Sequence, residues 1–363
     1  NIPILQYSNT PMMLPCFIDN PCPILYKGLY SPTLSRIGML NVLVTGGAGY
    51  TGSHVVKGLL HQGYHPIVYD NLQTGHRKAA GHATFIEGDL ADRAKLIKTF
   101  ESHPIQAVMH FAADCLVGES VENPAKYFNN NVKNSLQLIE IMEEYNIDKI
   151  IFSSSAAVFG EPKEIPIAED HPCSPMNPYG ETKWIFEKVL RSFSDRGKLK
   201  YISLRYFNAA GADPEGELGE NHSPETHLIP LVIRAALTRN PVLVFGTDYD
   251  TPDGTCIRDY VHVTDLAQAH ILGLQRLERG KDSAIYNLGN GSGYSVKEVI
   301  ETARKVTGME IVSIDSARRP GDPARLVASS EKISRELGWK PEYPDLKTII
   351  ETAWHWHRKH PKG

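Results

Sequence analysis

The stretch "VTGGAGYTGSH" (residues 44–54) decides the fold, because it places glycines at 46, 47, 49 and 52 directly after the mostly apolar run 40–44. Between a strand and a helix, Gly46 would allow the tight turn, Gly49 would let a ligand approach the backbone, and Gly52 would let the two elements pack closely. The first amides of the helix would then favour an anion such as a pyrophosphate. The stretch therefore predicts a dinucleotide-binding turn.

Two acidic residues extend this prediction. Asp70 ends the next predicted strand, 65–71, near the spacing of about 20 residues expected for the acid that binds the adenosine ribose. A carboxylate there would repel a 2′-phosphate, so the sequence favours NAD over NADP. Asp89, at the end of the predicted strand 83–90, stands where it could accept a hydrogen bond from the adenine amine.

Outward from the glycine turn, apolar runs alternate with segments of helical period. This alternation is typical of a parallel sheet covered on both faces. We therefore predict an α/β fold with a Rossmann-type doubly wound parallel sheet. The expected strands are 40–46, 65–71, 83–90, 106–113, 149–160 and 200–211, and the expected helices are 53–63, 92–102, 134–146 and 178–197.

The pattern loosens after about residue 209. The polar segment 211–227 is predicted as a loop, and the helices and short strands beyond it as a smaller α/β C-terminal lobe that binds substrate. The expected division is an NAD-binding domain at 39–208, with returning segments near 258–290, and a second lobe at 209–257 and 291–363. Residues 1–38 have no clear period, so we expect an appendage outside the fold, with Met39 the more natural start.

Composition excludes several classes of protein. The 363 residues are 41% hydrophobic with a net charge of -4, which gives no global basic field for nucleic acid. No apolar run approaches the roughly 20 residues needed to cross a bilayer, so no membrane span is expected. The five cysteines are scattered without metal-ligand spacing, so we expect reduced thiols, a cytoplasmic protein and no metal.

The chemistry is predicted at the segment "NPYGETKW". Tyr179 and Lys183 are four residues apart and share one face of a helix that Pro178 can begin. A free tyrosine has a pKa of about 10, and a nearby ammonium, together with a positive nicotinamide, would lower the pKa of Tyr179. Ser155, at the end of a predicted strand, could bond to the same substrate oxygen. We predict these three as the catalytic residues.

At this point the chain resembles the extended short-chain dehydrogenases/reductases, and within them the UDP-sugar 4-epimerases. The resemblance runs from Met39 to the end. The matching stretches are "VTGGAGYTGSH", "DNLQTG", "GDL", "HFAA", "VGES", "NNV", "FSSSAAVFGEP", "NPYGETK", "LRYFNAAGADP", "HLIP", "DGTCIRDYVHV", "YNLGNG" and "RRPGDPA".

The resemblance implies NAD as cofactor and C4 epimerisation between UDP-glucose and UDP-galactose through a transient 4-keto sugar. Tyr179 would be the base, and homodimers are common in the family. The residues implied around NAD are Gly46, Gly49, Tyr50, Thr51, Gly52, Asp70, Asn71, Asp89, Leu90, Phe111, Ala112, Asn130, Lys183 and Phe207. Those implied around the UDP-sugar are Asn208, His227, Leu228, Phe245, Arg258, Arg319, Asp322 and Leu326.

Several positions depart from the family pattern. Cys115 stands where some members have a lysine that contacts NAD, so one cation near the cofactor is lost. Ala157 replaces a common threonine, and Thr51 a usual isoleucine. Leu326 stands where some members have a tyrosine that narrows the sugar pocket, so we expect turnover of UDP-N-acetylhexosamines as well.

Other functions stay open on the sequence alone. A 4,6-dehydratase would need a carboxylate after the strand-end serines, which "SSSAAVFG" lacks. A 4-epimerase of UDP-xylose/UDP-arabinose or UDP-glucuronate would use the same C4 machinery. A dinucleotide sensor without catalysis, or an interaction protein, is disfavoured by the presence of both Tyr179 and Lys183.

Overall fold

The computed structural model describes residues 40–319 and 322–360, so the appendage expected at 1–38 lies outside the described residues. A seven-stranded sheet, parallel throughout, forms the centre of the described chain, in the order β11-β6-β5-β4-β1-β2-β3. Its strands are β1 (Asn41–Thr45), β2 (His65–Asp70), β3 (Thr84–Glu87), β4 (Ala107–His110), β5 (Lys149–Ser155), β6 (Lys200–Tyr206) and β11 (Ala284–Leu288).

The strand order confirms the doubly wound fold. From β1 the chain adds β2 and β3 on one side, and then returns to add β4, β5 and β6 on the other. Ligands of such sheets bind outside the carboxyl ends of the strands, at the point where the order reverses. The glycine turn after β1 lies at this point.

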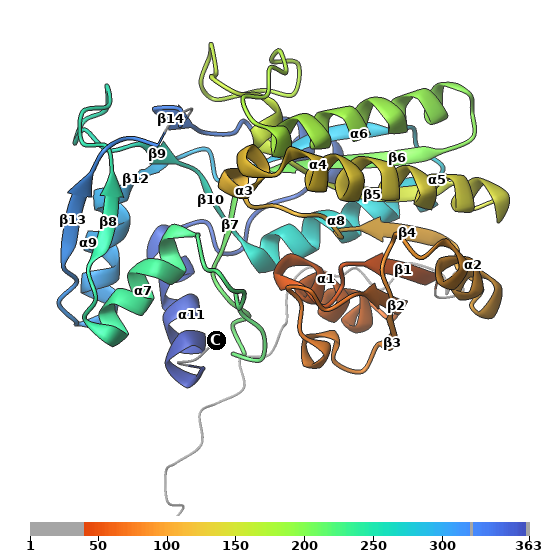
Figure 1. Cartoon of the computed structure of the whole chain (residues 1–363), viewed down its shortest axis with the longest axis horizontal. Helices are drawn as coiled ribbons and strands as arrows, with labels where there is room; N and C mark the ends of the chain where they lie inside the picture. The colour runs from red at the N-terminus through yellow and green to blue at the C-terminus, as the bar shows by residue number, and fades with distance from the viewer. Residues whose placement is uncertain (1–39, 320–321, 361–363) are drawn as a thin grey trace, which may run out of the picture. The chain divides into compact units, whose positions relative to one another are not determined.

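Two layers of helices cover the sheet, as the predicted alternation requires. On one face α1 and α8 pack through Val55, Leu59, Leu266 and Leu274. On the other face α2, α5 and α6 form a second apolar cluster. The bounds of these helices are α1 (Tyr50–His61), α2 (Arg93–Ser102), α5 (Ser135–Glu144), α6 (Pro178–Asp195) and α8 (Val263–Glu278). Figure 1 shows α5 and α6 running side by side over the sheet.

A second core lies in the C-terminal half, to the left in Figure 1. Three helices pack there around buried residues such as Ile233, Val299 and Ile350. Its elements are α7 (Leu228–Thr238), α9 (Val296–Thr307), α11 (Leu346–Lys359) and the parallel pair β8 (Val242–Phe245) and β13 (Ser313–Ser316). A capping box of Ser295 and Glu298 begins α9.

Short elements join the two cores. They are β7 (Asn208–Ala210), β9 (Ile257–Arg258), β10 (Tyr260–His262), β12 (Tyr294–Ser295), β14 (Arg325–Leu326) and α10 (Glu331–Leu337). After β4 the chain forms α3 (Val117–Glu122), α4 (Pro124–Tyr127) and a π-helical stretch, Phe128–Asn134. The 3₁₀ turns are Arg77–Ala80 and Ala156–Val158.

Three sequence expectations are wrong in detail. The strand expected at 149–160 ends at Ser155, where the serine side chain accepts a hydrogen bond from the Ala157 amide and starts a 3₁₀ turn. The strand expected at 200–211 ends at Tyr206, and β7 then pairs with β10 outside the central sheet. The segment 248–263, which the sequence predicts as a loop leading into a helix, contains β9 and β10, which are too short to show a period in the sequence.

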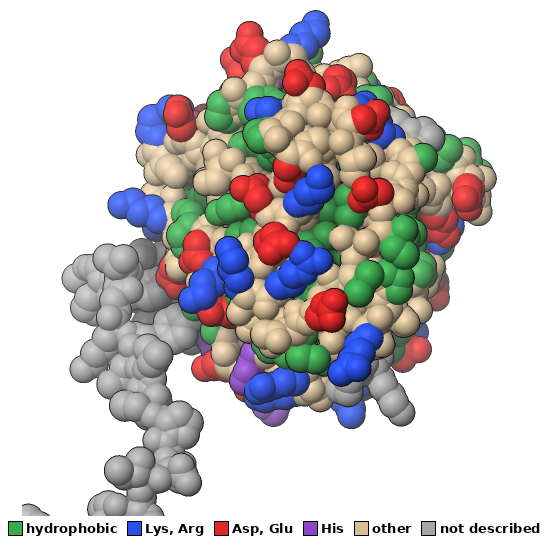
Figure 2. All heavy atoms as spheres, turned by 90° about the vertical axis from the view of Figure 1, so that its left-hand side faces the viewer, with side chains coloured by type: hydrophobic (Ala, Val, Ile, Leu, Met, Phe, Trp, Pro, Cys, Tyr) green, Lys and Arg blue, Asp and Glu red, His purple; other side chains and the backbone are tan. Residues whose placement is uncertain are grey.

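Within the described ranges, no helix combines the length and the apolar character that a bilayer crossing requires. On the face shown in Figure 2, basic and acidic side chains are interspersed with apolar ones. Charges of one sign do not gather on this face, in keeping with the net charge of -4.

Candidate active site

The turn between β1 and α1 is built around glycines that the chain itself requires. Gly46 has a φ of +72°, and an added Cβ would lie 2.5 Å from the Ala112 amide nitrogen. A Cβ on Gly52 would lie 2.2 Å from the Gly46 carbonyl oxygen, so helix and strand could not pack as they do. Both glycines therefore have the structural roles that the sequence predicts for them.

Gly49 is different, because the chain leaves open space beside it. A Cβ there would meet the Gly46 carbonyl oxygen at 3.4 Å, an ordinary contact, and its φ of -80° suits any residue. The reason for a glycine at this position therefore lies outside the protein. The open side of Gly49 at the N-terminus of α1 fits a bound pyrophosphate, as in a dinucleotide cofactor.

Asp70, at the end of β2, is held rigidly in place. Its Oδ2 accepts from the Ala48 amide at 2.9 Å and its Oδ1 from the Leu72 amide at 2.8 Å. Each oxygen keeps a second lone pair that a ribose hydroxyl could use. Next to it Asn71 donates to Asp89 Oδ2 at 2.7 Å. The structure thus brings the three polar residues predicted for the adenosine half to one edge of the sheet.

The other residues expected around NAD lie at neighbouring strand ends. Phe111 and Ala112 follow β4 directly and both donate their amides to the Thr45 carbonyl. Thr51 bonds to the Tyr206 hydroxyl, and Tyr50 donates to the Gly211 carbonyl oxygen at 2.7 Å. Three more positions are Leu90, buried after β3, Asn130 on the π-helical stretch and Phe207, buried directly after β6. Asn130 donates to Asp114 at 3.0 Å.

Tyr179 and Lys183 lie in the first turns of α6, which begins with Pro178 after the Asn177 cap. Ser155, at the end of β5, forms a hydrogen bond with the Tyr179 hydroxyl. The Lys183 ammonium donates to the Ser153 carbonyl oxygen at 2.8 Å and lies 5.9 Å from the centre of the Tyr179 ring. The structure therefore brings the three predicted catalytic side chains together.

Burial governs the protonation of this group in the chain by itself. Burial raises the pKa of Tyr179 well above its ordinary value, and the hydrogen bond from Ser155 offsets only part of that rise. Burial also lowers the pKa of Lys183 to about 8. In the chain by itself, desolvation of Tyr179 outweighs the Lys183 ammonium at this distance, and the expected joint effect of Lys183 and a positive nicotinamide on the pKa of Tyr179 stays a prediction. An additional positive charge is needed before Tyr179 can act as a base.

Cys115, expected to replace a lysine of the family that the chain resembles, lies close to these side chains. Its side chain is exposed, and a thiolate there would act on the pKa of both Tyr179 and Lys183. The surrounding protein raises the pKa of the Cys115 thiol, so it stays neutral at pH 7. Cys115 therefore contributes no charge where a lysine would have contributed one.

The residues expected around the UDP-sugar fall into three groups. Arg258 pairs with Asp322 and donates to the Pro323 carbonyl, and β9 and β14 set Arg258 beside Leu326. The Arg319 guanidinium stacks over the Phe245 ring at 4.1 Å. The remaining three lie on other elements: Asn208 on β7, and His227 and Leu228 at the start of α7.

Leu326 and His227 have informative surroundings. Leu326 packs against a small cluster that contains Ala156 and Phe207, next to the strand end with Ser155. His227 pairs with the buried carboxylate of Glu220. Burial alone would lower the pKa of His227, but Glu220 raises it above its ordinary value. Glu220 thus holds the His227 side chain in place at the beginning of α7.

Sequence analysis missed a buried network that supports the catalytic helix. Glu187, two turns after Tyr179 on α6, accepts from Ser154 at 2.6 Å and from Arg205 at 2.6 Å. Asp259 likewise accepts from the amides of residues 290, 291 and 328 at 2.7–3.1 Å. Only charges in otherwise apolar stretches could have indicated such residues, because their partners lie far away in the sequence.

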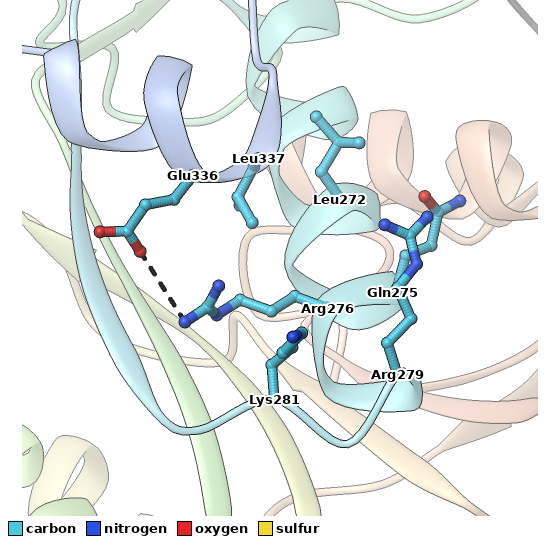
Figure 3. Close-up of a pocket in the computed structure, with 7 residues that line it drawn as sticks. All are labelled: Leu272, Gln275, Arg276, Arg279, Lys281, Glu336 and Leu337. Carbon is cyan, nitrogen blue, oxygen red and sulfur yellow. Dashed lines mark ion pairs between the residues drawn. The ribbon is translucent and has the colours of Figure 1, made fainter.

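A small pocket elsewhere does not belong to this site. It is lined by Leu272, Gln275, Arg276, Arg279, Lys281, Glu336 and Leu337. Figure 3 shows Glu336 and Leu337 of α10 facing the side chains from the end of α8, with Arg276 paired to Glu336 at 3.8 Å. The end of α8 leads into the start of β11, so the pocket lies at the amino edge of the sheet. The predicted site residues lie at the carboxyl edge.

Comparison with known proteins agrees with this geometry. The chain is 54% identical over 323 residues to a UDP-glucose 4-epimerase of Halalkalibacterium halodurans, covering 89% of this chain and 97% of the relative. It is 50% identical to a UDP-glucose 4-epimerase of Lacticaseibacillus casei, covering 89% and 98%. The crystal structure of UDP-glucose 4-epimerase from Brucella ovis in complex with NAD is 48% identical, with a TM-score of 0.85 and coverage of 87% and 98%.

A sequence model of the NAD dependent epimerase/dehydratase family matches residues 42–289. This range includes the glycine turn, the acidic residues of the adenosine edge and the Tyr179–Lys183 helix. From the glycine turn, the strand order and the extent of these matches, it follows that the chain belongs to the NAD dependent epimerase/dehydratase family.

Proposed function

We propose that this protein interconverts UDP-glucose and UDP-galactose by epimerisation at C4, with NAD as its cofactor. The observation on which the proposal rests is the convergence of Tyr179, Ser155 and Lys183 at the carboxyl edge of the sheet, beside the glycine turn. Relatives about half identical over nearly their whole length are named UDP-glucose 4-epimerase.

The residues present fit NAD. The open side of Gly49 takes the pyrophosphate, and the fixed Asp70 carboxylate takes the ribose hydroxyls and disfavours a 2′-phosphate. Asn71 and Asp89 border the adenine, and Lys183 the nicotinamide ribose. The other residues in contact are Gly46, Gly52, Tyr50, Thr51, Leu90, Phe111, Ala112, Asn130 and Phe207. When bound, NAD supplies a reversible hydride acceptor for C4 and a positive charge.

In the proposed reaction Tyr179 removes the proton of the sugar 4-hydroxyl and later returns it. Ser155 donates to the same oxygen and holds it near the tyrosine. Lys183, fixed by the Ser153 carbonyl, stabilises the phenolate once the remaining positive charge is present. The 4-keto sugar turns over between the two half-reactions, so the sugar must be held loosely while its diphosphate stays anchored.

The anchor for the UDP half comes from the C-terminal half of the chain. Arg258 and Arg319 can bind phosphate oxygens in a bidentate way. His227 and Leu228 present the N-terminus of α7 to the diphosphate. Asn208, Phe245 and Asp322 complete this part of the site. The functional division follows from these roles: 39–208 with segments near 258–290 binds NAD, and 209–257 with 291–363 binds the UDP-sugar.

Three finer points belong to the same proposal. Leu326, in place of a larger side chain, leaves room for the N-acetyl group of UDP-N-acetylhexosamines. The exposed parts of α5 and α6 form the contact of a homodimer. The protein is cytoplasmic, in keeping with the free thiols of Cys115, Cys173 and Cys256. UDP-xylose/UDP-arabinose and UDP-glucuronate are not favoured as main substrates, because the relatives are named for UDP-glucose.

The test is to incubate the purified protein with UDP-galactose and no added NAD, and to measure UDP-glucose. We expect product, because NAD that is regenerated in every cycle can stay bound. Tyr179→Phe is the matched control and should retain bound NAD while losing at least about 100-fold in kcat. Product that appears only after NAD is added indicates weak retention near Cys115. No product with added NAD would refute the proposal and direct the assay to other UDP-sugars.

A further inference from the structure

The polar loop that precedes α7 contains four potential metal ligands within eight residues. They are Glu220, His222, Glu225 and His227, and one nitrogen or oxygen atom from each lies within 4.8 Å of those of the other three. The catalytic residues described above do not include Glu220, His222 or Glu225. The spacing E-x-H-x-x-E-x-H escaped sequence analysis because it matches no common metal motif.

Burial makes this group unusual. The side chains of Glu220 and Glu225 are 2% and 1% exposed, although they lie side by side. Each carboxylate raises the cost of the other, because like charges repel and neither is solvated. Two buried carboxylates in contact therefore require positive charge between or beside them.

The imidazole groups show where that charge lies. Glu220 Oε1 faces two ring nitrogens, His222 Nε2 at 3.1 Å and His227 Nδ1 in a shorter contact. Glu225 Oε2 lies 3.7 Å from His222 Nδ1, while Glu225 Oε1 accepts from the His227 amide at 2.8 Å. Both carboxylates are thus fixed, and each offers an oxygen within 4.8 Å of a nitrogen of each histidine.

The second nitrogen of His222 adds an independent observation. His222 Nδ1 lies 3.3 Å from the Pro224 carbonyl oxygen, which can only accept. A histidine that binds a metal through one nitrogen usually donates the other N–H to a carbonyl or carboxylate. With the proton on Nδ1, Nε2 has a lone pair that faces an anionic oxygen. A metal ion at Nε2 would therefore meet a histidine whose other nitrogen already faces a carbonyl oxygen.

We propose that Glu220, His222, Glu225 and His227 bind a zinc ion that fixes the loop 211–227 in front of α7. Zinc favours four-coordinate sites of imidazole nitrogens and carboxylate oxygens at about 2.0–2.2 Å. Ligand atoms at those distances lie roughly 3.4 Å apart in a tetrahedron, and His222 Nε2 and Glu220 Oε1 lie 3.1 Å apart. One divalent ion replaces the positive charge of two imidazolium protons.

A neighbouring group of three acidic residues is neutralised by a lysine of the chain and needs no metal ion. Asp213, Glu215 and Glu217 also lie within 4.8 Å of one another. The Lys57 ammonium occupies their centre, at 2.9 Å from Asp213 and 2.9 Å from Glu217. None of the pairs described around Glu220 and Glu225 involves a lysine or an arginine. Lys57 therefore supplies the cation for Asp213, Glu215 and Glu217, whereas the group around Glu220 would take its cation from solution.

The test is the metal content of the full-length protein, prepared without a histidine tag or chelator and measured by plasma mass spectrometry. We expect roughly one zinc per chain. Chelation should lower the Tm, and added Zn²⁺ should restore it. Co²⁺ added to the chelated protein should give the visible absorption of a four-coordinate ion. None of these readouts depends on the proposed enzymatic activity.

Three variants locate the ion: Glu220→Gln, His222→Ala and Glu225→Gln should each lose the zinc. The matched control is His76→Asn, because His76 contacts the same loop at the Asn221 carbonyl, 3.1 Å away, without being a ligand. This control should keep its zinc. His222→Ala should also lose the Co²⁺ spectrum. If this variant still binds as much NAD as the wild type, it is folded, and the lost spectrum reports the loss of a metal ligand.

The proposal is overturned if chelated wild-type protein responds to neither Zn²⁺ nor Co²⁺ in Tm or spectrum. In that case two imidazolium ions neutralise the carboxylates. It is also overturned if His222→Ala retains zinc at the wild-type ratio, which would place the ion elsewhere, for example at the histidines of α11.

Discussion

Replacing Glu187 with glutamine tests how the catalytic helix is held on the sheet. Glu187 and Arg205 are each 4% exposed and meet at 2.6 Å, and Glu187 also accepts from Ser154. Ser154 precedes the catalytic Ser155 on β5, while Glu187 shares α6 with Tyr179. The substitution keeps the size of the side chain and removes its charge, so that Arg205 is left buried without its paired carboxylate.

Removing one member of a buried ion pair costs about 3–5 kcal/mol of unfolding free energy. With an unfolding entropy of about 2.1 cal/mol/K per residue, that cost lowers the Tm of a chain of this length by roughly 4–7 °C. The assay is urea or thermal unfolding followed by circular dichroism. We also expect kcat to fall while bound NAD is retained, because the Tyr179–Ser155 contact depends on α6 staying in register with β5.

Two comparisons make the argument refutable. Glu301→Gln removes an exposed pair with Arg304 on α9 and should cost about 0.5 kcal/mol or less. The double variant Glu187→Leu, Arg205→Met should regain most of the lost stability, since an apolar pair often replaces a buried ion pair without loss. A loss below about 1 kcal/mol in Glu187→Gln, or a double variant less stable than the single one, would refute the reasoning.

Three further outcomes follow from the same structure. Gly49→Ala should fold with a Tm near that of the wild type but copurify with less NAD. Gly52→Ala, whose Cβ would lie 2.2 Å from a carbonyl oxygen, should lose about 1–3 kcal/mol of unfolding free energy. Thermal unfolding and the NAD content of both purified variants test these outcomes. Burial lowers the pKa of His270 from 6.5 to about 4, so between these pH values the unfolded chain binds a proton that the folded chain does not. The free energy of unfolding therefore decreases as the pH is lowered from 6.5 to 4. His270→Phe should reduce the slope of unfolding free energy against pH by about 1.4 kcal/mol per pH unit in this range. The measurement is urea unfolding at several pH values, and a slope equal to that of the wild type would contradict the reasoning. Leu326→Tyr should abolish turnover of UDP-N-acetylglucosamine while UDP-galactose is still converted; a wild type inactive on the N-acetyl sugar contradicts this.

The parts of the site that the sequence predicts are those set by local geometry. The spacing of Gly46 and Gly52 follows from a turn of a few residues, and Tyr179 and Lys183 share a face because a helix has a fixed period. The parts of the site that the sequence does not predict are those decided by distant segments. The pKa of Tyr179 depends on burial by elements far apart in the chain, and the Glu187–Arg205 pair joins a helix to a strand. Such contacts leave no period in the sequence.

The position of β11 has a consequence for how the protein is made. β11 is an edge strand of the central sheet, yet it lies in the sequence after residues 207–283, which include α7, β8 and α8. At about 5–20 residues per second, a ribosome needs several seconds to synthesise that segment. During this interval one edge of β6 in the nascent chain has no partner strand. The apolar residues of β6 include Ile202 and Leu204. Such an edge is a template for pairing with other chains, so the interval before β11 emerges is when the growing polypeptide most needs a chaperone.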